Sequence, residues 1–265
     1  MADIELTKNG RIATITLNRP EARNAVTRDG WMDLLSMLQD VAADDEIGCV
    51  VLTGAGDAFS GGGDVKDMVA RLKSTEEDAP IDEQQKFIRH IVESSRLLHT
   101  MPKPTIAAIN GAAAGAGLSL ALACDMRLMV EDAKLTTAFG NIALSGDFGG
   151  AYFLTKIVGT AKAREMFFMP LPMTGKEAAE AGVVNRAVPR DQFDAVLGMI
   201  TQHIGNGPTK TYDFMKRNLN LALNSTLDDY FDQETMLMTL SFTFEDHREA
   251  ATAFVEKRQP KFKGK

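Results

Sequence analysis

Two glycine-rich turns and one isolated carboxylate are the residues of this chain best suited to carbonyl chemistry. Residues 60–64 (SGGGD) follow the apolar run 49–53, and residues 115–117 (GAG) follow the apolar run 105–109. Each turn can bring free backbone N–H groups to the end of a sheet, where they could bind an oxygen that becomes anionic. The carboxylate is Asp147, within the sequence SGDFGG. Together these residues predict a carbonyl-polarising pocket with one acid/base group.

The composition indicates an ordinary globular protein. The chain has 265 residues, of which 45% are hydrophobic and 25% charged, enough for one large domain or one domain with an appendage. Its net charge of −7 argues against nucleic acid or an anionic membrane as the main partner, because both usually require a basic patch. The first residues lack a basic region followed by an apolar stretch, and no segment reaches about 18 consecutive apolar residues. We therefore expect a cytoplasmic protein that binds neither nucleic acid nor membrane.

Histidine and cysteine placement gives no sign of a metal site. The four histidines do not cluster with cysteine or carboxylate at ligand spacings, so we predict no metal. Cys49 and Cys124 each lie in an apolar run, which favours two small buried side chains, with a disulfide as the alternative.

The first third of the chain alternates strand and helix patterns. Residues 4–8 and 12–17 flank an Asn-Gly pair and predict a β-hairpin. Apolar residues at helical spacing across 31–41 follow Thr27, a candidate N-cap, and the next apolar run is 47–52.

The rest of the chain changes from mixed to helical patterns. Polar residues 73–80 predict a loop, and helices are expected across 87–98 and 117–124, followed by a strand at 126–130. Residues 174–177 (TGKE) predict a capping box, and residues 183–188 (VVNRAV) a strand. From about residue 192 the patterns are nearly all helical, so we place a domain boundary near residue 200.

Four segments in order carry a family resemblance. They are residues 18–25 (NRPEARNA), 58–65 (AFSGGGDV), 109–117 (INGAAAGAG) and 178–184 (AAEAGVV). The chain resembles the enoyl-CoA hydratase/isomerase (crotonase) superfamily over most of its length.

The resemblance implies an α/β fold, a crotonase-like spiral of ββα units over residues 1–200. It implies a helical region over 201–265 that serves trimer assembly, giving a homotrimer or a hexamer formed by a dimer of trimers. The implied partner is an acyl-CoA thioester of acyl-CoA or fatty acid metabolism. Coenzyme A then enters as part of the substrate, and no separate cofactor is expected.

Carried over by position, the peptide N–H groups of Gly63 and Ala116 would form an oxyanion hole for the thioester oxygen as an enolate develops. The alternative is that both glycine turns only permit tight packing. Family hydratases generally use two glutamates, and Ser119 and Phe139 stand at the matching positions. Phe139 cannot accept a proton, and Ser119 is a poor base unless another group activates it, so two-glutamate hydration is not expected.

Asp147 falls near a position where a carboxylate recurs in ring-epoxyphenylacetyl-CoA isomerases and dienoyl-CoA isomerases, to which the chain is similar. One carboxylate is enough for a 1,3-proton shift through the thioester enolate, so the resemblance favours an isomerase. Burial beside Phe139 and Phe148 would raise the pKa of Asp147 and make it a stronger base. The alternative is a helix N-cap with no chemistry.

Three other functions stay open. A hydratase could use Asp147, Ser119 or Asn141 as an unusual water-activating group. The chain also resembles 4-chlorobenzoyl-CoA dehalogenases, whose chemistry needs a histidine and a tryptophan; Phe139 stands near the tryptophan position and His90 only in the histidine's general region. The last alternative is a non-catalytic acyl-CoA-binding protein.

Substrate-binding positions carried over from the family lie in four places. Ala22 and Arg23 follow Pro20, and Phe254 and Lys257 lie near the C-terminal end, where the lysine could pair with a phosphate of coenzyme A. Arg23 and Lys257 could equally be solvated charges. The remaining predicted contacts are Gly61, Gly62, Asp64, Val65 and Phe139.

Overall fold

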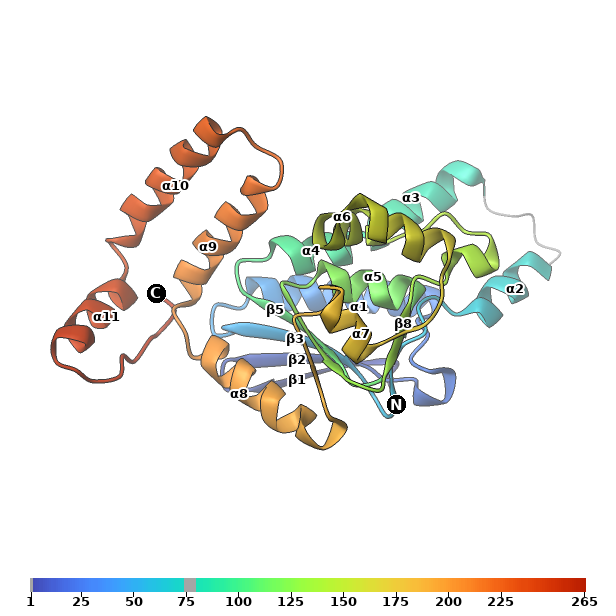
Figure 1. The fold of residues 1–265 in the computed structure, drawn as a ribbon, viewed down its shortest axis with the longest axis horizontal. Helices are drawn as coiled ribbons and strands as arrows, with labels where there is room; N and C mark the ends of the chain where they lie inside the picture. Colours follow the sequence, from blue (N-terminus) through green and yellow to red (C-terminus); the bar gives the residue numbers. More distant parts are fainter. Residues whose placement is uncertain (1, 74–79) are drawn as a thin grey trace.

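The computed structural model describes residues 2–73 and 80–265, and two β-sheets organise its core (Figure 1). The predicted loop at 73–80 lies outside the described residues except at its two ends. Within the described ranges, no helix combines the length and apolar character needed to cross a membrane.

The larger sheet has six strands in the order β1-β2-β3-β5-β7-β10. These strands are β1 (Ile4–Asn9), β2 (Ile12–Leu17), β3 (Cys49–Gly54), β5 (Thr105–Ile109), β7 (Met126–Val130) and β10 (Arg186–Val188). β1 and β2 form the predicted antiparallel hairpin, and Gly10 in its turn has a φ of 56°. The other neighbours pair in parallel, and the nearly complete burial of β3 and β5 explains their continuous apolar sequences.

The smaller sheet contains the strands that lead into the glycine turns. Its strands, in spatial order, are β4 (Ala58–Ser60), β6 (Ala112–Ala114), β8 (Lys134–Thr136) and β9 (Met173–Thr174). β3, β5 and β7 are followed in the chain by β4, β6 and β8, and β4 and β6 each precede a helix, α2 (Val65–Lys73) or α5 (Gly115–Ala123). This repetition confirms the predicted α/β fold of ββα units. It also corrects the position of the turns, which follow β4 and β6 rather than the longer apolar strands directly.

Helices cover the larger sheet on two sides. α1 (Arg28–Ala43), α4 (Glu93–Thr100) and α5 pack in sequence, and α6 (Gly150–Phe168) packs on α5. In Figure 1, α8 (Phe193–Gly205) lies on the opposite side from α5, and it contacts β2, β3 and β7. The predicted caps are confirmed: the Thr27 hydroxyl accepts from Gly30 N at 3.1 Å, and Thr174 and Glu177 form a capping box on α7 (Gly175–Glu180).

Two predicted elements differ in extent. The helix expected across 87–98 is divided at Val92 into α3 (Ile81–Ile91) and α4, where the Ser95 hydroxyl donates to the Val92 carbonyl at 2.9 Å. The strand expected from residue 183 is reduced to β10, because Val183 N donates to Ala178 O at 2.8 Å and so completes the end of α7. Cys49 and Cys124 are buried free thiols, as predicted, and burial raises the pKa of both to about 12.

The last three helices form an arm that extends from the core (Figure 1): α9 (Thr209–Ala222), α10 (Leu227–Ser241) and α11 (Glu245–Val255). Lys216 on α9 is 6% exposed, and its ammonium group donates to Leu98 O, Lys103 O and the Asp125 carboxylate at 3.0, 3.2 and 2.8 Å. α8 runs through residue 200 and packs on the sheet, so the arm proper begins with α9. The division at residue 200 stays a prediction.

A second attachment joins the arm to the hairpin at the start of the chain. Arg11, between β1 and β2, donates to Gly205 O at 2.9 Å, to Thr209 Oγ1 at 2.6 Å and to Lys263 O at 2.7 Å. One guanidinium group therefore holds the end of α8, the start of α9 and the C-terminal tail together.

Candidate active site

The two glycine turns lie against each other. β4 and β6 pair in parallel, with Ala58 opposite Ala112, so the turns leave the same end of the smaller sheet. Gly62 has a φ of 90°, and a Cβ atom placed on it would lie 3.0 Å from Ala116 N and 3.0 Å from Ala114 O. Only glycine allows this close approach of the first turn to the start of α5.

Both predicted oxyanion amides are free to bind a ligand. Val26 N donates to Gly62 O at 2.8 Å and Asp64 N donates to Val26 O at 3.0 Å, so the bonds to Val26 come from the residues on either side of Gly63. The Gly63 N–H therefore points away from Val26. Ala116 lies in the first turn of α5, where a helix provides no internal acceptor. Among the described residues neither N–H has an acceptor, which is the arrangement that an oxyanion hole requires.

Asp147 lies in a turn just before α6. The backbone has positive φ at Gly146 (107°), Phe148 (47°) and Gly149 (73°). The Oδ1 atom of Asp147 is buried and has no hydrogen-bond partner among the described residues, and burial raises the pKa of this carboxyl from 3.8 to about 6. The N-cap alternative is wrong: Gly149 is the N-cap residue of α6, and no side chain caps this helix.

Buried aromatic contacts hold the Asp147 turn. The Phe148 ring is 1% exposed, and its centroid lies 4.4 Å from that of Trp31 on α1. A Cβ atom on Gly149 would lie 2.8 Å from the ring of Phe153, which is also near His99 with centroids 5.1 Å apart. The turn is therefore fixed against both α1 and α6.

Phe139 connects the Asp147 turn to the oxyanion turn. It begins η2 (Phe139–Ile142) and is 5% exposed. Its ring atoms lie 3.9 Å from a Cβ placed on Gly115 and 3.8 Å from one placed on Gly146. The ring also stacks on Phe167, with centroids 6.1 Å apart. Gly115 of the second glycine turn and Gly146, which precedes Asp147 in the sequence, therefore both border the Phe139 ring.

The other candidate acid/base residues are either held by a backbone carbonyl or exposed to solvent. The Ser119 hydroxyl is buried and donates to Gly115 O at 3.2 Å, which leaves it without an activating partner among the described residues. Asn141 and His90 are both exposed, the latter on α3. Neither Ser119 nor His90 therefore has the surroundings of an activated catalytic group.

Several predicted substrate-binding residues lie next to the first glycine turn. Gly61 N donates to Arg23 O at 2.8 Å, and Arg23 follows η1 (Pro20–Ala22) with an exposed side chain and a φ of 53°. The Asp64 carboxylate instead accepts from Arg19 at 2.9 Å and from Lys66 N at 2.9 Å, so it stabilises the start of α2. Val65 is largely exposed beside it.

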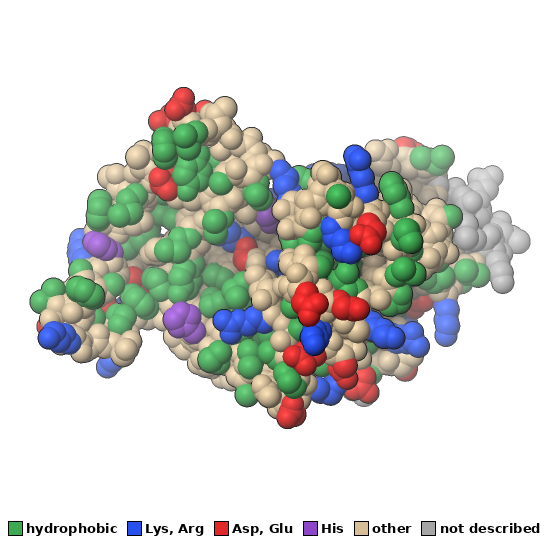
Figure 2. All heavy atoms as spheres, in the orientation of Figure 1, with side chains coloured by type: hydrophobic (Ala, Val, Ile, Leu, Met, Phe, Trp, Pro, Cys, Tyr) green, Lys and Arg blue, Asp and Glu red, His purple; other side chains and the backbone are tan. Residues whose placement is uncertain are grey.

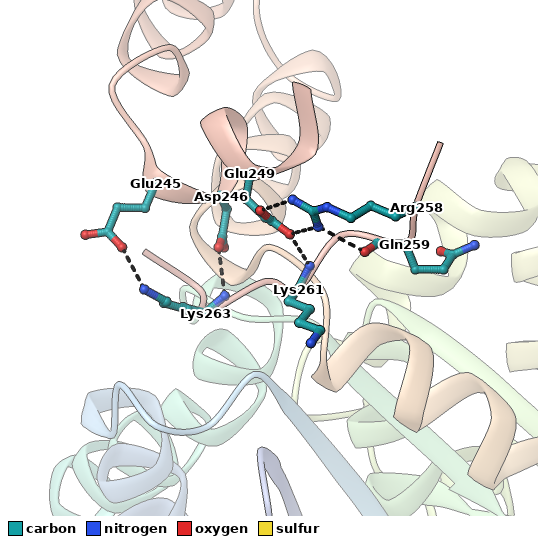
Figure 3. A pocket seen from close by; sticks show the side chains of 7 residues that line it. All are labelled: Glu245, Asp246, Glu249, Arg258, Gln259, Lys261 and Lys263. Atoms are coloured by element: carbon teal, nitrogen blue, oxygen red, sulfur yellow. Dashed lines mark hydrogen bonds and ion pairs between the residues drawn. The ribbon is translucent and has the colours of Figure 1, made fainter. Parts of the chain in front are cut away.

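Phe254 and Lys257 are not brought to the site within one chain. Phe254 is 85% exposed on α11, and Lys257 follows that helix; Figure 1 shows α11 at the opposite end of the molecule from α2. The depression in Figure 3, between α11 and the C-terminal tail, is lined by residues that pair with one another: Arg258 donates to Glu249 at 2.6 Å, and Asp246 accepts from Lys263 N at 2.7 Å. These bonds hold the C-terminal tail against α11.

Met68 and Trp31 belong to the site but did not emerge from the sequence as site residues. The Met68 Cε atom lies 2.6 Å from where a Cβ on Gly63 would be, so this side chain packs against Gly63 and leaves no room for a larger residue there. Trp31 has the helical spacing of a core residue, and its spacing gives no hint of the contact with Phe148. Within residues 2–73 and 80–265, no three His, Cys, Asp or Glu residues are arranged to hold a metal ion.

Comparisons with known proteins point to one family. The family model for enoyl-CoA hydratase/isomerase matches residues 7–265. The 1,2-epoxyphenylacetyl-CoA isomerase of Escherichia coli K12 is 33% identical over 254 residues, which are 96% of this chain and 95% of that protein. The short-chain-enoyl-CoA hydratase of Clostridium acetobutylicum is 29% identical over 259 residues, 97% of this chain and 96% of the relative. The crystal structure of enoyl-CoA hydratase from Bacillus anthracis has a TM-score of 0.91 at 27% identity and covers 100% of both chains.

Proposed function

The chain belongs to the enoyl-CoA hydratase/isomerase family, and we propose that within this family it acts as an isomerase that moves a double bond of an acyl-CoA thioester. Family membership confirms the crotonase resemblance of the sequence. The choice of isomerase rests on one observation: Asp147 has a buried carboxylate oxygen with no described partner, while Ser119 and Phe139 stand where hydratases of the family carry glutamates.

In the proposed reaction the Gly63 and Ala116 amides donate to the thioester oxygen. Their hydrogen bonds strengthen as negative charge develops on that oxygen, which stabilises the enolate. Asp147 removes a proton from a carbon activated by the thioester, the C–H electron pair enters the conjugated system, and the double bond moves by one position. The same carboxyl then returns the proton to the other end of the delocalised enolate. No water is consumed and no net oxidation occurs, so the reaction needs no cofactor beyond the coenzyme A of the substrate.

The surroundings of Asp147 suit this role. A pKa of about 6 leaves the carboxylate mostly ionised at pH 7 but makes it a stronger base than an ordinary aspartate. The aromatic rings of Phe139 and Phe148 border its turn, and a substrate bound against them would limit the access of water, which favours return of the same proton over attack by water.

The alternatives find less support in the site. A hydratase would need a second group to activate water, and the Ser119 hydroxyl is engaged with a carbonyl. A dehalogenase would need a histidine beside the carboxylate, but His90 is exposed on α3. A non-catalytic acyl-CoA-binding protein would gain nothing from a buried, unpartnered carboxylate, whose desolvation is unfavourable.

We also propose assembly as a homotrimer or a dimer of trimers in the cytoplasm. Figure 2 shows hydrophobic side chains gathered over the arm. Exposed apolar residues on α9 and α10 include Met215, Leu219, Phe231, Met236 and Met238. In such an assembly Phe254 and Lys257 would contact coenzyme A in the site of a neighbouring copy, beside its Ala22 and Arg23.

The proposal is tested in deuterated water with 2-enoyl-, 3-enoyl-, dienoyl- and 4-chlorobenzoyl-CoA esters. Double-bond migration with deuterium gain supports isomerisation, and Asp147→Asn should abolish it while thioester binding is retained. Asp40→Asn, a change at an exposed aspartate on α1, is the matched control and should be fully active. A hydroxylated product would instead identify a hydratase, release of chloride a dehalogenase, and no turnover across the panel a binding protein.

A further inference from the structure

We propose that Ser119 is a positioning residue: through its contact with Gly150 it sets the position of the Asp147 turn relative to the Ala116 amide. This inference rests on the proposed function, in which those two groups act on one substrate. It gives a role to a residue that has no acid/base partner of its own.

The contact between Ser119 and Gly150 is unusually close. A Cβ atom added to Gly150 would lie 2.3 Å from Ser119 Oγ and 3.2 Å from Ser119 Cβ. Ser119 is 1% exposed and its hydroxyl donates to Gly115 O, so the side chain has little freedom to move aside. The glycine at 150 therefore fits the serine at 119, and neither can grow without displacing the other.

The contact joins the two halves of the site. Ser119 and Ala116 lie on the same face of α5, one turn apart, so they move as one unit. Gly150 begins α6, and its N–H donates to Asp147 O at 3.0 Å. Any displacement of Gly150 from Ser119 is transmitted directly to the Asp147 backbone.

A small displacement is enough to matter. A methyl group on residue 150 would start 2.3 Å from Ser119 Oγ, so the Asp147 turn would have to move away by about 1 Å. A misplacement of that size at a catalytic group costs about 100-fold in rate. We therefore expect Gly150→Ala to lower kcat about 100-fold with a nearly unchanged KM. Ser119→Ala, which removes the oxygen that contacts Gly150, should also lower kcat, by about tenfold, with a nearly unchanged KM.

The decisive measurement is rescue. Ser119→Ala removes the oxygen at 2.3 Å and leaves only the Cβ at 3.2 Å, so Ser119→Ala/Gly150→Ala should recover about tenfold or more of the kcat lost in Gly150→Ala. Gly198→Ala is the matched helical control: a Cβ there meets no atom within 4 Å, and activity should not change. A double variant as slow as Gly150→Ala, or a fully active Gly150→Ala, would overturn the inference.

A readout independent of turnover separates this inference from the proposed function. The pKa of the Asp147 carboxyl can be measured by following its titration with carbon-13 NMR. This pKa should fall from about 6 toward 3.8 in Gly150→Ala, because water reaches the displaced turn, and it should return toward 6 in the double variant. If Asp147→Asn proves fully active, the proposed function fails and this titration alone decides the positioning role. If Gly150→Ala does not fold, Ser119→Thr is measured in its place, because its extra methyl group crowds the same contact. An unchanged kcat together with an unchanged pKa of Asp147 in Ser119→Thr would refute the role of the contact.

Discussion

Replacing Asp147 with asparagine should stabilise the protein while abolishing its activity. Burial disfavours the ionised carboxylate in the folded state, and Oδ1 has no described partner that could offset this cost. Asparagine has nearly the same shape and no charge to desolvate. The folded protein therefore tolerates Asp147 at neutral pH only at the expense of stability.

The size of this effect follows from the pKa. A carboxyl whose pKa rises from 3.8 to about 6 binds more protons folded than unfolded, so the stability of the parent protein falls as the pH rises through that window. The penalty is absent well below pH 3.8 and complete above about pH 6, where it reaches about 3 kcal/mol as an upper value. Relative to the parent protein, Asp147→Asn should gain about 3 kcal/mol at pH 8 and roughly half as much at pH 5.

The assay is denaturant unfolding of both proteins at one fixed protein concentration and at several pH values from 5 to 8. Fixed concentration matters because assembly of copies would contribute to the measured free energy. Asp40→Asn, at an exposed aspartate, should show no pH-dependent gain. A less stable Asp147→Asn at pH 8, or a difference that stays constant across the pH range, would refute the claim that burial governs this carboxyl.

Two further predictions concern the pH profile and the arm. The log of kcat/KM should fall with unit slope below about pH 6, because Asp147 must be ionised to accept a proton, and a profile that is flat from pH 5 to 8 would exclude it as the base. Lys216→Met should lower the free energy of unfolding by about 3 kcal/mol, since it removes the buried ammonium group that pairs with Asp125 and donates to two carbonyls. Lys210→Met at an exposed position of α9 is the control, and equal stability of the two variants would contradict the role of Lys216.

The sequence predicts the features of this protein that depend on neighbouring residues. The Asn-Gly turn, the Thr27 cap and the capping box at Thr174 all follow from local chemistry, and the structure has each of them. Strands β4 and β6 escape prediction because three residues are too few to show a strand periodicity. They form because each follows a long buried strand and pairs with the other.

The geometry of the site depends on contacts between distant segments. Asp147 is recognisable as an isolated carboxylate, but its burial results from Phe148 packing on Trp31, more than 100 residues earlier in the chain. No local pattern encodes such contacts, so the sequence predicted the type of chemistry better than its surroundings.

The three hydrogen bonds of Arg11 have a consequence for the order in which the chain folds. They span 194, 198 and 252 residues, although Arg11 lies in a hairpin that can form early from local contacts. On a ribosome the hairpin emerges long before any of its three carbonyl and hydroxyl acceptors has been synthesised. The guanidinium therefore stays hydrated through most of translation, and docking of the arm is among the last events of folding.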